Sequence, residues 1–436
     1  MGNYIINKFM QKGLWRNKDF LKFWLGETLA MFGSRVTSLA LPLVAAITLS
    51  ATPWEMGVLN ALQFSPYLII GLFAGVYIDR LRRKPIMIIA NIGRAILLIL
   101  IPIAYMLDML QVYHLYIIGF LVGSLTLLFD LSYQSYLPSL VGKEHLTEGN
   151  SKLEVSRSVA DVSGPGIAGA LISIFAAPIV MLIHSITLLC SAFSMILITK
   201  SEPEQPKHIK PKPIFKEISK GLRFVFGNKY LRAIAGEAST YNMFGQVMAA
   251  VSILYITREL GITPTLLGII LSTASIGSII GSLIANYIGK KYNLGTIVLV
   301  TMILGCSAPL LIPLASGPLY VTVPLLIVSY FFGSMGVVIS NIYVVSIRQT
   351  ITPNEMLGKM NASYRFVVTG VTPIGALLGG ALGSVIGLRM TLLVGAIGTL
   401  TALIWVLYSP LINLKKMPEE MNETDYDLPK EKVLAK

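Results

Sequence analysis

The chain is dominated by a succession of apolar stretches of about 20 residues or more, separated by short polar segments. A stretch of that length crosses a bilayer as a helix, because backbone groups cannot be left unpaired in hydrocarbon. The sequence predicts twelve spans, over residues 20–48, 55–79, 85–107, 112–138, 152–174, 177–199, 232–257, 263–289, 294–315, 318–347, 360–386 and 389–411. The expected fold class is therefore an all-α membrane protein.

Composition supports this prediction. Of the 436 residues, 54% are hydrophobic and only 13% are charged, whereas soluble domains carry about 25% charged residues. Cys190 and Cys306 both fall in apolar stretches, so they indicate neither a disulfide framework nor a metal site. The first span follows a polar basic segment and is too long for a signal sequence, so we expect no cleaved signal peptide.

The basic residues predict the orientation. With a cytoplasmic N-terminus, most of the 35 Lys and Arg residues fall in cytoplasmic segments, and the opposite loops hold only Arg258 and Arg389. Both termini are then cytoplasmic, in a multi-pass protein of the cell membrane, with the bacterial inner membrane as the expected location. The net charge of +13 comes from basic residues that face the anionic headgroups of membrane lipid. Binding to nucleic acid is therefore not needed to explain this charge, and we expect no nucleic-acid partner.

One hydrophilic interruption divides the chain. Its first part, "SEPEQPKHIKPKP", is typical of an extended linker, and its second part, "IFKEISKGLRFVF", has one apolar helical face, as in an interfacial helix. We predict an N-terminal six-helix bundle over residues 1–200, a cytoplasmic linker with an interfacial helix over 201–229, a C-terminal six-helix bundle over 230–411, and a disordered cytoplasmic tail over 412–436.

The two halves are similar in sequence at a shift of 210 to 212 residues. Matching pairs include Gly26-Glu27 with Gly236-Glu237, Gly164 with Gly375, and Met31-Phe32-Gly33 with Met243-Phe244-Gly245. Each half has an even number of predicted spans, so the two copies have the same orientation. Parallel repeats of this kind are found in transporters that bind substrate near the membrane midplane, between two rocking halves.

Two motifs resemble those of the major facilitator superfamily. "GVYIDRLRRK" (Gly75 to Lys84) resembles its loop between spans two and three, although Arg82 stands where the pattern prefers glycine. "ADVSGPGIAGA" (Ala160 to Ala170) resembles its antiporter motif, with two glycines replaced by alanine. The stretches "FLKFWLGETLAMFGS" and "FDLSYQSYLPSLVGKEHLTEGN" resemble the drug:proton antiporter branch that contains macrolide-efflux and enterobactin-exporter proteins.

The resemblance implies a cytoplasmic gate. Gly75, Asp79, Arg80 and Arg83 belong to the loop motif, and the family's Asp contacts span eleven when the carrier faces outward. Asp130, near the cytoplasmic end of span four, is expected to pair with Arg80 or Arg83. The alternative is that the basic residues only enforce topology.

The antiporter motif implies a kinked span five, packed tightly against the other half. Gly164 and Gly169 allow close helix approach, and Pro165 removes a backbone donor. The alternative is ordinary packing of small residues.

Ionisable residues inside the spans are candidates for proton coupling. Arg157 and Asp161 are four residues apart, so we expect them to pair, with Asp161 either exchanging a proton or forming a fixed structural pair. Arg35 is placed to neutralise an acid or meet an anionic substrate group. Glu27 and Glu237 are further candidates, but their duplication favours shared architecture, with Glu27 anchoring spans one and seven and Glu237 as its symmetric partner.

Polar and aromatic residues on the second and seventh spans are candidates for lining the substrate cavity, with helix packing as the alternative. These are Gln63, Phe64, Tyr241, Asn242, Gln246 and Tyr255.

No enzyme or nucleotide-binding motif is present: the chain lacks H-E-x-x-H, G-x-S-x-G and G-x-x-x-x-G-K-[ST]. We therefore expect a transporter rather than an enzyme, without metal or cofactor. The prediction is a monomeric, proton-coupled exporter of amphipathic small molecules, either drugs such as macrolides or a siderophore-like metabolite, working by alternating access. An importer or lipid translocator on the same scaffold is the alternative.

Overall fold

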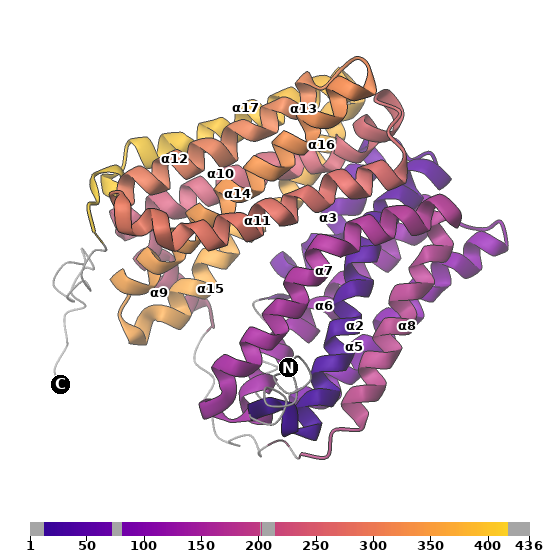
Figure 1. Ribbon diagram of the computed structural model, residues 1–436, viewed down its shortest axis with the longest axis horizontal. Coiled ribbons are helices and arrows are strands. Elements are labelled where there is room, and N and C mark those ends of the chain that lie inside the picture. The colour runs from indigo at the N-terminus through magenta and orange to yellow at the C-terminus, as the bar shows by residue number, and fades with distance from the viewer. Residues whose placement is uncertain (1–12, 72–80, 201, 203–213, 417–436) are drawn as a thin grey trace, which may run out of the picture.

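The structure is a computed structural model that describes residues 13–71, 81–200, 202 and 214–416, and every regular element in these ranges is helical (Figure 1). The first half comprises α2 (Lys18–Leu43), α3 (Pro53–Ile69), α5 (Arg83–Met106), α6 (Val112–Val141), α7 (Leu146–Ile174) and α8 (Ala177–Ile196). The second comprises α10 (Lys229–Leu254), α11 (Pro264–Lys291), α12 (Leu294–Ser307), α13 (Leu311–Leu314), α14 (Leu319–Ile351), α15 (Asn354–Gly370), α16 (Thr372–Ile386) and α17 (Leu388–Leu407). Two π-helical turns, η2 (Val44–Thr48) and η4 (Tyr255–Glu259), extend α2 and α10.

Within the described residues, nine helical segments are long and apolar enough to cross a membrane. The other three predicted spans correspond to α3, α7 and α10. The α3 helix is described only as far as Ile69, and α7 and α10 carry charged residues such as Asp161 and Glu237. Large apolar side chains such as Leu283 and Val385 are 73% and 82% exposed, as expected for surfaces that face lipid. The predicted all-α membrane fold is confirmed.

The helices repeat with a spacing of 211 residues. Four pairs of helices begin at this spacing: Lys18 and Lys229, Pro53 and Pro264, Arg83 and Leu294, and Ala177 and Leu388. The N-caps agree, because Asn17 and Asn228 each accept hydrogen bonds from the backbone two and three residues later, and Thr52 and Thr263 cap α3 and α11. Side chains that satisfy the same orphan N–H groups therefore start equivalent helices in both halves.

This register corrects the alignment of the duplicated glutamate. At 211 residues, Glu27 aligns with Ala238 and Glu237 aligns with Gly26. A one-residue offset turns a side chain by about 100° around an α-helix. The two Gly-Glu pairs match as letters but do not occupy equivalent positions.

The Met-Phe-Gly match is also out of register. Gly33 aligns with Phe244 at 211 residues, and a Cβ at Gly33 would collide with the side chain of Thr187 in α8. In the second half the glycine is on the other helix: Gly398 in α17 is the mate of Thr187, and a Cβ at Gly398 would collide with the ring of Phe244. A small residue on one helix of each pair accommodates a large residue on the other.

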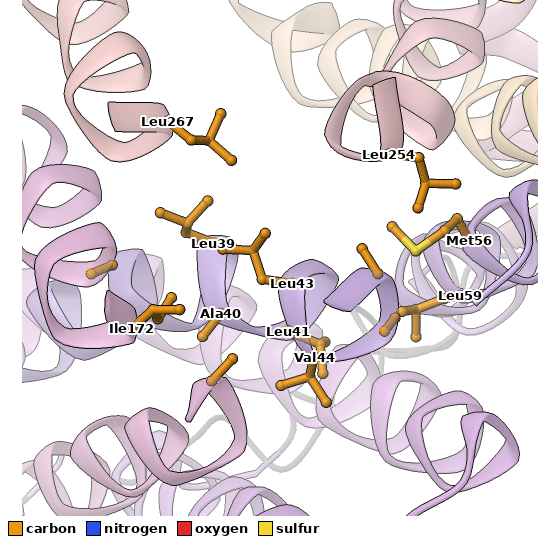
Figure 2. Packing of buried hydrophobic residues seen from close by; sticks show 14 of the residues in the cluster. Leu39, Ala40, Leu41, Leu43, Val44, Met56, Leu59, Ile172, Leu254 and Leu267 are labelled. Carbon is orange, nitrogen blue, oxygen red and sulfur yellow. The ribbon is translucent and has the colours of Figure 1, made fainter. Parts of the chain in front are cut away.

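The two halves meet at one end of the molecule. We call the end at which α2 and α10 begin the proximal end and the opposite end the distal end; the ribbons converge distally and spread proximally (Figure 1). One buried cluster joins both halves distally, where Leu39 and Leu43 of α2 lie opposite Leu254 and Leu267 of α10 and α11 (Figure 2). Proximally, each half has its own buried cluster.

Helix α9 (Ile214–Gly227) lies in the segment for which an interfacial helix was predicted. Its described side chains Phe224 and Val225 are buried in the proximal cluster of the second half. A Cβ at Gly221 would lie 2.6 Å from the carbonyl oxygen of Lys359, so α9 packs closely on α15. This part of its apolar face therefore contacts protein rather than lipid.

Candidate functional site

Glycines bring the two halves into backbone contact at two equivalent crossings. In the α7–α11 crossing, a Cβ at Gly268 would collide with the carbonyl oxygen of Pro165 and lie 3.2 Å from Cα of Gly169. In the α3–α16 crossing, a Cβ at Gly57 would lie 2.7 Å from Cα of Gly380. The two crossings are related by the 211-residue repeat, and neither tolerates a side chain without movement.

Hydrogen bonds add to the distal contact. The hydroxyl oxygens of Ser173 in α7 and Thr265 in α11 lie 2.5 Å apart. Nη2 of Arg258, in η4, donates to the carbonyl oxygen of Ala46 in η2 at 2.7 Å. The distal end is thus held by both apolar packing and polar contacts between the halves.

Pro165 provides a polar contact through the backbone. A proline inside a helix leaves the carbonyl four residues earlier without its usual donor. That carbonyl belongs to Asp161, and Oγ of Ser275 in α11 donates to it at 2.6 Å. At the equivalent crossing Ala376 and Phe64 take the places of Pro165 and Ser275, so this bond exists in one crossing only.

An ion pair joins α2 to α7 next to this crossing. Nε of Arg35 lies 2.5 Å from Oδ1 of Asp161, and the two side chains are 43% and 32% exposed. Gly164 makes the approach possible, because a Cβ there would lie 2.5 Å from Cβ of Arg35. At 1.5 Å per residue, Arg35 lies roughly 25 Å along α2 from its proximal end. The pair is therefore far from both ends of the segment formed by α2 and η2, although its side chains are partly exposed.

The predicted pairing of Arg157 with Asp161 is wrong. Nε of Arg157 lies 3.6 Å from Oε2 of Glu154, one turn earlier on α7. Both of these side chains are largely exposed, whereas Asp161 turns toward α2. Spacing along one helix identified possible neighbours, but the stronger partner of Asp161 came from another helix.

The second half keeps the geometry of this site without its charges. Gln246 is the repeat mate of Arg35, and Thr372 is the mate of Asp161. A Cβ at Gly375, the mate of Gly164, would lie 3.1 Å from Cβ of Gln246. The same close packing is thus present in both halves, but the ion pair occurs only in the first.

Glu27 belongs to a buried polar network inside the first half. Its side chain is 3% exposed, and Oε1 accepts a hydrogen bond from Oγ of Ser191 at 2.9 Å. Ser191 in turn accepts from Nδ2 of Asn91 at 2.9 Å, and Oδ1 of Asn91 accepts from Arg94. The guanidinium of Arg94 lies 4.6 Å from the ring centroid of Phe129. The network connects α2 with α8, α5 and α6.

Glu237 has no comparable network. Its side chain is half-buried, and it makes no hydrogen bond or ion pair with any residue that the structure describes. The mates of Ser191 and Asn91 are Ala402 and Met302, which cannot donate to a carboxylate. The predicted symmetric role is wrong, since Glu27 contacts span six rather than span seven.

We predict that Ser191→Ala destabilises the protein by about 1–3 kcal/mol, because a buried carboxylate loses its direct donor. Ser185→Ala is the matched control: Ser185 is also fully buried on α8, but its hydroxyl bonds only to Met181 of the same helix. Thermal unfolding of the two purified variants measures the difference. Equal losses would show that the Glu27 contact contributes nothing specific.

The predicted cytoplasmic gate is only partly described. Gly75, Asp79 and Arg80 lie outside the described residues. Asp130 accepts a hydrogen bond from the hydroxyl of Tyr67 in α3 at 3.0 Å, and Arg83 pairs instead with Glu202, at 3.6 Å. The structure therefore does not show the predicted pairing of Asp130 with Arg83.

Glu202 was missed by the sequence analysis. Its side chain is 4% exposed, and its carboxylate accepts hydrogen bonds from the backbone nitrogens of Arg83 and Lys84 at 2.8 and 3.2 Å. It thus caps α5, whose first two residues are the last two of the loop motif. The only available signal was an acidic residue at the start of a basic linker.

The cavity candidates do not form one set. Tyr255 is 1% exposed and donates to the carbonyl oxygen of Ala315 at 2.7 Å, so the prediction that it lines a cavity is wrong. Asn242 donates to the carbonyl oxygen of Val368 at 3.1 Å and joins α10 to α15. Asn242 is nevertheless partly exposed, and so are four other candidates: Gln63, Phe64, Tyr241 and Gln246.

With this geometry established, comparison with known proteins identifies the family. Residues 13–434 match the major facilitator family described as transmembrane secretion effectors. The chain belongs to this family. It is therefore a membrane transporter of the major facilitator type, a class that is generally non-enzymatic.

Two curated relatives match over most of their length. An uncharacterized MFS-type transporter, YfiS of Bacillus subtilis, is 24% identical over 396 residues, which cover 88% of this chain and 92% of that protein. The multidrug efflux pump Tap of Mycolicibacterium fortuitum is 25% identical over 373 residues, covering 80% and 87%.

Solved structures share the fold. A bacterial homologue of the iron transporter ferroportin in an inward-facing state has a TM-score of 0.71 at 17% identity, covering 90% of this chain and 98% of that one. A bacterial homologue of the lysosomal transporter Spinster, inward-facing and unoccupied, has a TM-score of 0.66 at 13% identity, covering 91% and 98%.

Proposed function

We propose that the protein exports amphipathic small molecules in exchange for protons, by alternating access. The observation that carries this proposal is the Arg35–Asp161 ion pair, which lies far from both ends of the segment formed by α2 and η2, beside the α7–α11 crossing, and has no charged counterpart in the second half. The similarity to a multidrug efflux pump supports export of drug-like compounds. The proposed location is the cell membrane, with both termini in the cytoplasm and the protein working as a monomer.

Basic residues support a cytoplasmic proximal end. Arg83 and Lys84 begin α5, and Lys290 and Lys291 end α11, all at the proximal end. Under the positive-inside rule this end faces the cytoplasm. Among the described residues, the halves share a buried cluster only at the distal end, so the proposed state is open toward the cytoplasm and ready to accept a substrate for export.

The coupling step uses the residues that α7 brings together. A proton on the Asp161 carboxylate removes its charge and so weakens the ion pair with Arg35. The same residue accepts the Ser275 hydrogen bond through its carbonyl, so α7 carries the effect directly into the contact with α11. Protonation then favours separation at the distal end, and deprotonation favours the closed arrangement.

The proposal also assigns roles to the two bundles, the linker and the cytoplasmic gate. Residues 1–200 and 230–411 are the two rocking bundles in this proposal, joined by the linker at 201–229. Asp79 with Gly75, Arg80, Arg83 and Asp130 closes the cytoplasmic side in the outward-facing state.

Transport in everted membrane vesicles tests the proposal. We expect a fluorescent amphipathic cation to accumulate inside vesicles whose interior is acidified, without ATP, and the accumulated dye to leave when a protonophore is added. Vesicles from cells without the protein are the control. Efflux of preloaded dye on acidification would indicate an importer, and accumulation that survives the protonophore would contradict proton coupling.

A further inference from the structure

An internal carboxylate ties α2 to the end of α8 at the proximal end of the first half. Asp19, on the first turn of α2, pairs with Nζ of Lys22 at 2.9 Å. Its two oxygens also accept hydrogen bonds from the backbone nitrogens of Thr199 and Lys200 at 3.2 and 2.9 Å, and from the Thr199 hydroxyl at 3.0 Å. One anion thus joins the beginning of the first span to the chain that leaves the sixth.

The second half lacks this carboxylate, and its helix α10 begins with two cations, Lys229 and Arg232. Tyr230 is the repeat mate of Asp19, and Pro410 is the mate of Thr199. Lys229 and Arg232 lie on the first turn of α10, are exposed, and form no ion pair with any residue in the described ranges. Two positive charges therefore lack the internal anion that the first half supplies.

A pocket of about 360 Å³ lies beside these two cations, between the start of α10 and the end of α17. Its lining contains no acidic residue and consists of Lys229, Arg232, Ala233, Ile404, Trp405, Tyr408, Ser409 and Pro410. The pocket thus combines two cations with apolar and aromatic walls between α10 and α17.

The aromatic wall is held in place from α10. Nε1 of Trp405 donates to Oγ1 of Thr240 at 3.1 Å. The indole also packs over Gly236, where a Cβ would collide with the ring. Beside it, Tyr408 and Ile404 are 89% and 52% exposed, so the pocket opens toward the outer surface of the bundle.

We propose that this pocket binds the phosphate headgroup of an anionic phospholipid, in the leaflet at the proximal end of the spans. Lys229 and Arg232 contact the phosphate, and an acyl chain lies along Ile404. Tryptophan, tyrosine and basic residues at the end of a span match the polarity of the membrane interface, and basic clusters there attract anionic lipid. The lipid replaces the carboxylate of the first half and links α10 to α17, and the proposal does not depend on the transported substrate.

Native mass spectrometry of the full-length protein tests this site. We expect phosphatidylglycerol to bind with about tenfold higher affinity than phosphatidylcholine, because its net charge is complementary to two cations. The double variant Lys229→Gln with Arg232→Gln loses that preference. The control is Lys290→Gln with Lys291→Gln, which removes two positive charges at the proximal end of α11. We expect this control to keep the preference for phosphatidylglycerol.

A second measurement locates the lipid. The sequence has four tryptophans, and when Trp15, Trp24 and Trp54 are changed to phenylalanine only Trp405 remains. Brominated phosphatidylglycerol should quench its fluorescence more than brominated phosphatidylcholine, and inorganic phosphate at millimolar concentration should not relieve the quenching. Relief by free phosphate would assign the site to the free ion rather than a lipid, and equal quenching by both lipids, or equal loss in both double variants, would overturn the proposal.

Discussion

Replacing Asp161 with asparagine is expected to cause a large loss of proton-driven export while leaving the amount of protein in the membrane unchanged. Asparagine keeps the size of the side chain but can neither pair ionically with Arg35 nor exchange a proton. Coupling free energies between sites are typically about 1–3 kcal/mol, so their loss corresponds to a decrease of roughly 5- to 150-fold. Dye accumulation in acidified everted vesicles measures the decrease.

Glu154→Gln is the matched control. It makes the same chemical change on the same helix, but Glu154 pairs with Arg157 on an exposed face, where an ion pair contributes little. We expect export by this variant to remain near the wild-type level. If Asp161→Asn also retained proton-driven export, Asp161 would have no part in coupling.

The difference between these two carboxylates shows what sequence alone cannot decide. Both lie within four residues of Arg157, so spacing along the helix offers either as its partner. The choice depends on how α7 is rotated against α2, and Gly164 sets that contact by leaving room for the stem of Arg35. Rotation of one helix against another depends on the packing of both, and no single helix sequence encodes it.

The helices themselves were predictable because their signals are local. Long apolar stretches are a signal within one segment, and they placed the spans of both halves near their observed positions. The repeat was also visible, but matching letters misplaced its register at Glu27 and at Gly33. The two halves share the positions of contacts rather than the residues: the contact of Gly33 with Thr187 corresponds to that of Phe244 with Gly398, where the glycine is on the other helix.

Polar contacts that cross between helices were the least predictable part of the site. Ser275 gave no sequence signal of its own, yet it satisfies the carbonyl that Pro165 leaves without a donor. Glu202 likewise lies far along the chain from the helix that it caps. In each case the need for a partner was local, because a proline or a helix end is visible in the sequence, but the partner came from elsewhere in the fold.

Replacing Gly268 with alanine is expected to open the distal end. The added Cβ would meet backbone atoms of Pro165 and Gly169, which cannot turn aside as a flexible side chain can. Overpacking of this kind costs about 1–3 kcal/mol, enough to shift a two-state equilibrium roughly 5- to 150-fold away from the distally closed state. Because the proposed alternating access requires both states, transport should fall with the loss of that state.

Disulfide trapping measures the closed state directly. In a background with Cys190 and Cys306 changed to serine, Ser173→Cys and Thr265→Cys place two thiols where the hydroxyl oxygens lie 2.5 Å apart. We expect rapid cross-linking without Gly268→Ala and much slower cross-linking with it.

The control for this experiment lies on the same interface. A Cβ at Gly166 would be 3.4 Å from Oγ of Ser272, which is ordinary contact, so Gly166→Ala should leave both cross-linking and transport unchanged. Unchanged cross-linking in Gly268→Ala would mean that α7 and α11 adjust without separating, and the glycine crossing would then not control the distal closure. A selective loss in Gly268→Ala would show that backbone contact between the halves, rather than the side-chain bonds around it, makes that closure possible.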